Sequence, residues 1–175
     1  LSKQCVKGSP EYMKGAEAGN IWPRGTKDLV DGEEGILVQP VHFSKCWIEW
    51  LPERGGFVAR HETRPPEAVL MEDPKKPKKK IWVMPSGNIV NESREHVVFV
   101  HGVYDKPVPF VIPMSGSQHA ASRGWMGLMN KKFTPKGEIA PSYAYLYQMR
   151  TTHRTNGTDN WMGWDITDAG EDGAE

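Results

Sequence analysis

The chain has 175 residues, of which 38% are hydrophobic, and this length fits one globular domain rather than two. Its 22 basic residues are balanced by 22 acidic residues, which argues against a uniformly basic protein that coats duplex DNA and against a wholly acidic decoy. The charge is uneven, however, because residues 165–175 hold five acidic residues and no basic one, so the other 164 residues carry a net charge of +5. We therefore expect a mildly basic body with an acidic end.

Proline and glycine punctuate the whole chain and predict a mainly β protein. The 14 Pro and 18 Gly divide the sequence into short segments, which leaves little room for long helices. Pro40 lies inside the first apolar run and predicts an edge strand or a bulge there. In chain order, the predicted strands or extended segments are 36–43, 46–51, 57–62, 81–84, 88–90, 94–104 and 107–113.

One helix is predicted, over residues 117–131. Ser115 or Ser117 can cap its start, and apolar residues recur at helical spacing from Ala121 to Met129. After a loop rich in Pro and Gly, residues 142–152 alternate as a strand does, followed by a hairpin loop at 153–160 and a return strand at 161–166. The first of these strands would place Tyr143, Tyr145 and Tyr147 on one face.

The cysteines and the apolar runs predict a reducing compartment and no membrane partner. Cys5 and Cys46 cannot make a disulfide framework and lack the paired spacing of a zinc finger. The longest apolar stretches, 97–100 and 36–38, are far shorter than a membrane span, and the start of the chain shows no signal-peptide core. We expect a soluble, intracellular protein.

The sequence contains no motif that predicts catalysis. It lacks a phosphate-binding loop, a Gly-x-Gly-x-x-Gly turn, a Gly-x-Ser-x-Gly elbow and a His-Glu-x-x-His helix. His42 with Cys46, or His96 with His101, has metal-like spacing, but such residues in a strand more often form a half-buried pair. We therefore expect no enzyme, no metal and no cofactor.

Basic residues interleaved with aromatic residues are the strongest functional signal. Residues 74–80 read PKKPKKK, and their mutual repulsion predicts an exposed mobile loop, which is either a solvated connection or an arm that grips phosphates. Residues 121–164 carry a local charge of +4 and most of the exposed stacking candidates. The predicted nucleic-acid-binding residues are Lys75, Lys76, Lys78, Lys79, Lys80, Arg123, Trp125, Lys131, Lys132, Tyr143, Tyr145, Tyr147, Arg150, Arg154 and Trp161, with Trp22 as a further stacking candidate.

Two of these features have competing interpretations. Alternating tyrosines such as Tyr143, Tyr145 and Tyr147 are more often the inner wall of a core than a stacking surface. The acidic end is expected to be exposed, and its last residues, 167–175, are taken as a tail. Such a tail is either inert or competes with nucleic acid for basic residues and recruits partner proteins.

Three stretches of the chain resemble the single-stranded DNA-binding proteins of tailed bacteriophages. They are 4–21, with Ser9-Pro10-Glu11 followed by Ala18-Gly19; 36–56, ILVQPVHFSKCWIEWLPERGG; and 109–164, where a Ser-x-Gln helix with Trp125 and Met129 precedes a Tyr-rich strand and a hairpin. The resemblance implies an OB-like barrel of five or six strands with one inserted helix, as a single domain over 1–166. The chain departs from many such proteins in ending without an aromatic residue, at Gly173-Ala174-Glu175.

The function implied by this resemblance is sequence-tolerant binding of single-stranded DNA in phage replication or recombination, in the cytoplasm of an infected bacterium. The acidic tail would bind replication or recombination proteins. The sequence does not decide whether the chain forms a homo-oligomer. The alternative is a virion structural or assembly protein, since short strands and neutral charge also suit a capsid or tail subunit. A small nuclease is a third candidate, for which a cluster of carboxylates or histidines is missing from the sequence.

Overall fold

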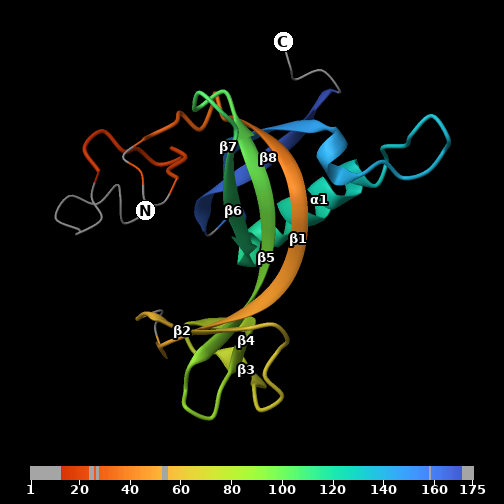
Figure 1. Ribbon diagram of the computed structural model, residues 1–175. Helices are drawn as coiled ribbons and strands as arrows, with labels where there is room; N and C mark the ends of the chain where they lie inside the picture. Colours follow the sequence, from red (N-terminus) through yellow and green to blue (C-terminus); the bar gives the residue numbers. More distant parts are fainter. Residues whose placement is uncertain (1–12, 24–25, 27, 53–54, 158, 171–175) are drawn as a thin grey trace. The chain divides into compact units, whose positions relative to one another are not determined.

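The computed structural model describes residues 13–23, 26, 28–52, 55–157 and 159–170 (Figure 1). Cys5 and the acidic residues Glu171, Asp172 and Glu175 lie outside this part. The described residues are mainly β, as the sequence predicts, with one α-helix, α1 (His119–Met129). The strands are β1 (Ile36–Trp50), β2 (Phe57–His61), β3 (Val69–Asp73), β4 (Lys76–Val83), β5 (Ile89–His101), β6 (Val108–Ser115), β7 (Leu146–Thr155) and β8 (Asn160–Gly170).

The eight strands form an open antiparallel sheet. Its main hydrogen-bonded order is β3-β4-β5-β1-β7-β8, with β2 paired to β1 and β6 paired to β5. Within the described part of the chain, the end strands β3 and β8 pair with no second neighbour, so the predicted barrel of five or six strands is wrong. The two strands expected at 36–43 and 46–51 join into one long strand, β1, which pairs with different partners along its length.

Pro40 lies within β1, between the residues that pair with β7 and those that pair with β2. Residues Ile36–Val38 pair with β7, and Trp47–Trp50 pair with β2. The missing N–H of Pro40 therefore removes a hydrogen bond from neither ladder. The sequence pattern alone could not show that the strands predicted at 36–43 and 46–51 belong to one strand.

The chain folds into two compact units, and β1, β5 and β6 contribute residues to both. The first unit comprises Leu1–His42, Val97–Val111 and Ala120–Glu175, and the second comprises Phe43–His96 and Ile112–His119.

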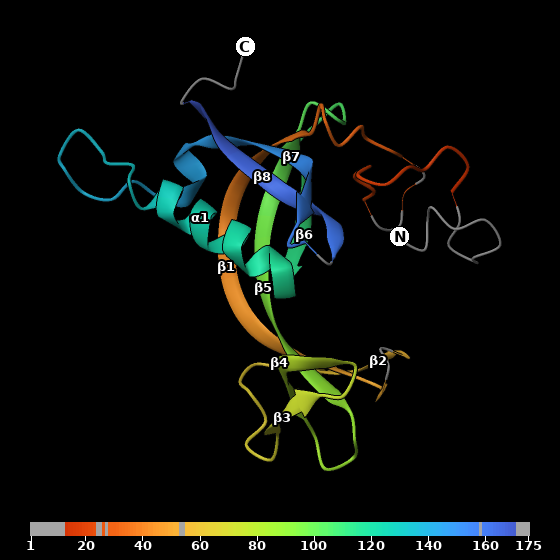
Figure 2. The same cartoon turned by 180° about the vertical axis from the view of Figure 1, so that it is seen from behind.

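The first unit is built on β7, β8 and the helix. β7 and β8 pair along nearly their whole length, from Leu146↔Gly170 to Thr155↔Asn160. The predicted helix is confirmed, although it begins at His119 after a 3-10 turn at Gly116–Gln118 and ends at Met129. Trp125 on this helix is buried, and its ring meets that of Tyr147 on β7 edge to face, with 5.8 Å between the ring centroids. Figure 2 shows α1 as a coiled ribbon, seen from behind relative to Figure 1.

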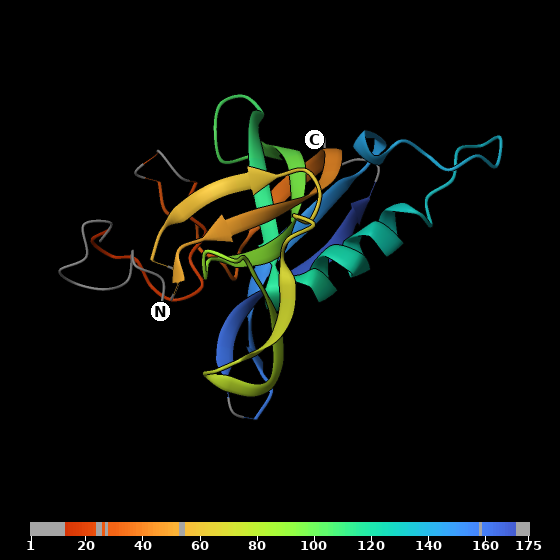
Figure 3. The same cartoon turned by 90° about the horizontal axis from the view of Figure 1, so that it is seen from below.

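Three antiparallel pairings shape the described part of the second unit, which also holds the end of β6. β2 pairs with the end of β1, β3 pairs with β4, and β4 pairs with the start of β5. Figure 3 shows the β3–β4 hairpin in yellow and yellow-green. The fully buried side chains of this unit include Cys46, Val90, His96 and Met114, and the His96 ring lies 4.9 Å from that of Phe43.

Candidate nucleic-acid interface

The three tyrosines expected on one strand face do not share a strand. Pro141 leads into a 3-10 turn, Ser142–Ala144, and β7 begins only at Leu146, so the predicted strand over 142–152 starts four residues late. The side chain of Tyr143 is 58% exposed, that of Tyr145 is 8% exposed and that of Tyr147 is fully buried. Burial raises the pKa of Tyr147 to about 12.

Trp125, Tyr145 and Tyr147 belong to the core of the first unit. A base can stack only on a ring face that solvent reaches, and these three side chains are buried. The core interpretation therefore applies to them, and Tyr143 is the tyrosine of this group that presents its side chain to solvent. Its carbonyl accepts a hydrogen bond from Gln39 Nε2 at 2.7 Å, which ties the 3-10 turn to β1.

The basic residues of the first unit that were predicted to bind DNA differ in whether an acidic side chain already pairs with them. Arg123 and Lys131 are exposed on and after α1. Lys132 is half-buried, with its Nζ 4.6 Å from the centroid of the Tyr145 ring and in an ion pair with Asp168. That ion pair holds the pKa of the Asp168 carboxyl below its usual value.

Part of the acidic end is a strand rather than a tail. Residues 165–170 continue β8, where Asp165 lies opposite Arg150 and Asp168 lies opposite Tyr147. This strand corrects the expectation of disorder from residue 165 and of a tail from 167, as far as Gly170, whereas Asp165, Thr167 and Asp168 are exposed as expected. The remaining residues, 171–175, lie outside the described part of the chain.

The β7–β8 hairpin carries the other predicted residues of the first unit. Arg154 lies opposite the half-buried Trp161, and its guanidinium is 3.5 Å from a carboxylate oxygen of Asp165. The exposed Arg150 donates from Nε to the Glu34 carbonyl at 3.4 Å. Trp22, by contrast, donates from its indole N–H to the Thr26 carbonyl at 2.9 Å, a local structural contact.

The lysine run is a β-hairpin, which corrects the expectation of a mobile loop. Pro74 and Lys75 form the turn between β3 and β4, and the lysines from Lys76 onward lie on β4. Opposite charges across the hairpin explain why a run of lysines can form a strand, because Glu72 lies opposite Lys80 and Asp73 lies opposite Lys76. Exposed side chains of the run are Lys75, Lys76, Lys79 and Lys80, while the side chain of Lys78 lies outside what the structure describes.

Trp82 and Arg64 are an aromatic and basic pair that the sequence did not single out. Trp82 follows Lys80 by two residues on β4, so both side chains lie on the same face of the hairpin. The guanidinium carbon of Arg64 lies 3.9 Å from the centroid of the Trp82 ring. The alternation of Lys80 and Trp82 was the available signal, but it is visible only once β4 is known to be a strand.

Two carboxylates in the second unit are held by internal partners. Glu49 accepts hydrogen bonds from Asn88 Nδ2 at 2.6 Å and from His61 Nε2 at 2.9 Å, and both lower its pKa. Glu95 accepts from Arg60 at 2.8 Å and from the Cys46 thiol at 3.2 Å, and the Arg60 bond holds its pKa below the usual value. Burial raises the pKa of the Cys46 thiol. These groups join β1, β2 and β5 to one another.

Neither metal-like pair from the sequence gains the third ligand that a metal site needs. Among the residues that the structure describes, no group of three His, Cys, Asp or Glu side chains is placed to hold a metal ion. Burial lowers the pKa of His96 to about 4, so this ring is neutral at pH 7. No described helix has the length and apolar character needed to cross a membrane.

Comparison with known protein families gives a match over nearly the whole chain. The family model of the Pam3 phage gp34-like proteins matches residues 1–174, which takes in both units of the structure. No curated protein and no solved structure matches the chain.

Proposed function

Because the chain belongs to the Pam3 phage gp34-like family, a family of bacteriophage proteins, we propose that it binds single-stranded DNA with little sequence preference during phage replication or recombination. The observation that carries the proposal is the order of elements in the first unit. Along the chain, its parts are β1, β5, β6, α1, β7 and β8.

We infer from this order an OB-like arrangement whose sheet is left open. An OB fold has three strands, a helix and two further strands, with its first strand between the second and the fourth. Here the corresponding hydrogen-bonded order is β6-β5-β1-β7-β8, and the opening lies between β6 and β8. OB folds bind oligonucleotides on the face of their second and third strands and with the loops that join strands one to two and four to five.

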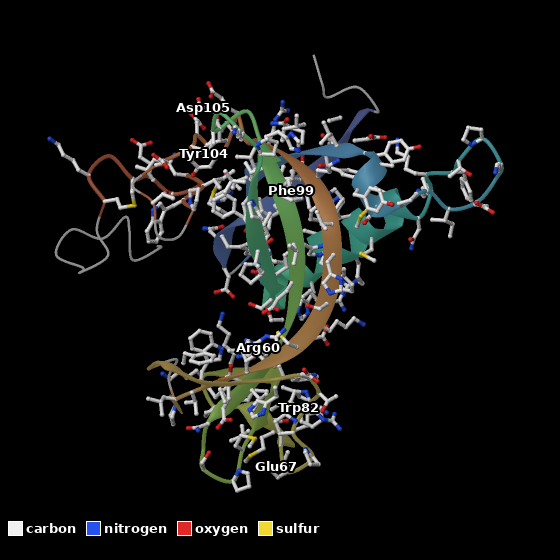
Figure 4. The ribbon with its side chains drawn as sticks, in the orientation of Figure 1. Arg60, Glu67, Trp82, Phe99, Tyr104 and Asp105 are labelled. Atoms are coloured by element: carbon white, nitrogen blue, oxygen red, sulfur yellow. The ribbon has the colours of Figure 1, made fainter. Side chains whose placement is uncertain are left out.

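Some of the basic candidates fall on or beside those two connections, whereas Arg123, Lys131 and Lys132 lie on or just after α1. The connection between the first and second OB strands corresponds to residues 51–88, which contain the lysines of β4. The connection between the fourth and fifth corresponds to the short β7–β8 turn, flanked by Arg154 and Trp161. On the second OB strand, β5, the ring of Phe99 is partly exposed and is available to stack on a base (Figure 4).

A virion structural or assembly role remains the second candidate, and one observation favours it. Val69, Leu70 and Met71 are 60%, 44% and 52% exposed on β3, a strand at the end of the sheet order. Consecutive exposed apolar residues on an edge strand are typical of a surface that another chain covers. A capsid or tail subunit would bury them on assembly.

Sedimentation velocity with a labelled, unstructured oligonucleotide separates the two candidates. If the chain binds single-stranded DNA, the label moves with the protein at low salt and leaves it at high salt, because phosphate contacts release counterions. If the chain is an assembly subunit, it self-associates as its concentration rises and the label stays at the rate of free DNA. The second result would overturn the proposed function.

A further inference from the structure

We propose that Trp82 and Arg64 form a binding site for one unstacked nucleobase, which lies flat on the indole ring. This inference rests on the proposed function and assigns to the second unit a stacking site that the sequence did not indicate. All of its residues belong to that unit, so the site needs no contribution from the first.

The position of Arg64 marks the ring face that a base would take. Its guanidinium carbon lies over the Trp82 ring, 3.9 Å from the ring centroid, which is the distance of a cation–π contact. At that distance nothing fits between the two, so an entering base displaces Arg64 from the indole. Arg64 can move, because it is exposed and lies in the irregular segment between β2 and β3.

A displaced Arg64 still has a partner. Guanidinium planes stack on bases as well as on aromatic side chains, so Arg64 can close over the outer face of the base. The result is a base held between the Trp82 ring and the Arg64 guanidinium, and the arginine keeps a planar partner before and after binding.

The indole is fixed before any base arrives. Trp82 lies opposite Leu70 on one side and opposite Val90 on the other, and the Trp47 ring meets it edge to face at 6.2 Å and 88°. Leu70 is 44% exposed on the same face of the hairpin and extends the apolar surface beside the ring. A ring held in place loses little freedom on binding, which favours stacking.

The backbone of the bound nucleotide has a cation within reach. Lys80 lies two residues from Trp82 on the same face of β4, about 7 Å along the strand. A base on Trp82 therefore brings its phosphates close to Lys80 and to the other exposed lysines of the hairpin. Paired bases cannot enter such a site, so it selects single strands over duplex.

The experiment compares oligothymidine binding by the wild-type chain, Trp82→Phe, Trp82→Leu and the control Phe57→Ala, using fluorescence anisotropy. Phe57 is an exposed aromatic on β2 of the same unit, at 62% exposure, and lies outside the proposed site. We expect Trp82→Phe to retain most of the affinity, Trp82→Leu to lose about tenfold, and Phe57→Ala to stay within about twofold of wild type.

Photocrosslinking gives a second readout that needs no substitution. An oligonucleotide with a halogenated uracil crosslinks to the aromatic ring on which it stacks, and mass spectrometry identifies the linked peptide. We expect a crosslink at Trp82. A folded Trp82→Leu variant that binds like wild type, or a wild-type chain that crosslinks only at other residues, would overturn the site and leave the proposed function standing. A wild-type chain that binds no oligonucleotide would overturn both.

Discussion

Lys132 and Asp168 form an ion pair that joins the segment after α1 to the last strand, β8. The same ammonium group lies over the Tyr145 ring, so one lysine contacts an acid and an aromatic residue at once. Asp168 belongs to the acidic end of the chain, and it neutralises a lysine that the sequence analysis assigned to DNA binding. One acidic residue of this end thus already occupies a lysine that was predicted to bind DNA.

Truncation after Gly170 tests whether the remaining acidic residues compete with DNA. This end point removes Glu171, Asp172 and Glu175 and leaves β8 and the Lys132–Asp168 pair intact. We expect single-stranded DNA to bind modestly more tightly at low salt and equally at high salt, because the competition is electrostatic and screened. Equal affinity at every salt concentration would exclude the tail as an internal competitor.

The exposed lysines of β4 are expected to contribute to the salt dependence of binding. Replacing Lys79 and Lys80 with Ala should lower affinity and flatten the slope of log K against log salt by about 0.7 for each phosphate that the hairpin no longer neutralises. Lys136→Ala is the matched control, since this exposed lysine lies in the loop after α1 and belongs to the first unit, whereas the hairpin belongs to the second. If the double variant and the control have the same slope as wild type, the hairpin does not touch phosphates.

Truncation to Ala should strongly affect the free energy of unfolding at one of two neighbouring tyrosines and hardly affect it at the other. Tyr145→Ala should lower the free energy of unfolding by about 3 to 5 kcal/mol, because the side chain is buried and packs beneath Lys132. Tyr143→Ala should change it by no more than about 0.5 kcal/mol, because that side chain is exposed. Urea denaturation of both variants measures the difference, and a Tyr145→Ala variant as stable as wild type would contradict the assignment to the core.

Acid should destabilise the fold through His96. Its pKa in the folded protein is about 4, below the ordinary 6.5, so its contribution to stability is complete above pH 6.5 and is lost as the pH falls toward 4. Between about pH 7.5 and pH 4.5 we expect a loss of roughly 2 to 3 kcal/mol. The folded-state pKa values of Glu49 and Glu95 are lowered, so these carboxylates reduce the free energy of unfolding only when the pH falls below the ordinary pKa of a glutamate.

His96→Gln supplies the comparison for that pH dependence. The variant lacks the titrating ring, so its free energy of unfolding should change less than that of wild type over the same pH interval. Denaturant titrations of both proteins at about pH 7.5 and about pH 4.5 measure how much the free energy of unfolding of each one changes over this interval. Identical pH dependence in the two proteins would mean that another group is responsible.

The sequence predicted the class of fold and the helix because these depend on local patterns. Pro and Gly spacing indicated a mainly β chain, and the recurrence from Ala121 to Met129 located α1 to within two residues of its observed ends. The open sheet could not be foreseen in the same way. It depends on which distant segments pair, and the partners of β1 on either side of Pro40 leave no mark in the local pattern.

The candidate site was predicted less well, for physical reasons that particular residues show. Alternation of side chains suggested a strand through Tyr143, but Pro141 favours a turn there and the strand begins only at Leu146. Lysine repulsion suggested a loop, but Glu72 and Asp73 across the hairpin offset it. Trp82 escaped notice because its contact with Arg64 joins residues from separate segments, which no short motif records.

The most direct test of single-stranded DNA binding is a titration that follows intrinsic Trp fluorescence with one unstructured oligonucleotide, at about 50 mM and about 200 mM salt. A duplex of the same length serves as competitor. The account predicts quenching, a slope of log K against log salt of about −2 or steeper, and much weaker competition by the duplex. No quenching and no salt-dependent binding at either concentration, or a duplex that competes as well as the single strand, would contradict it.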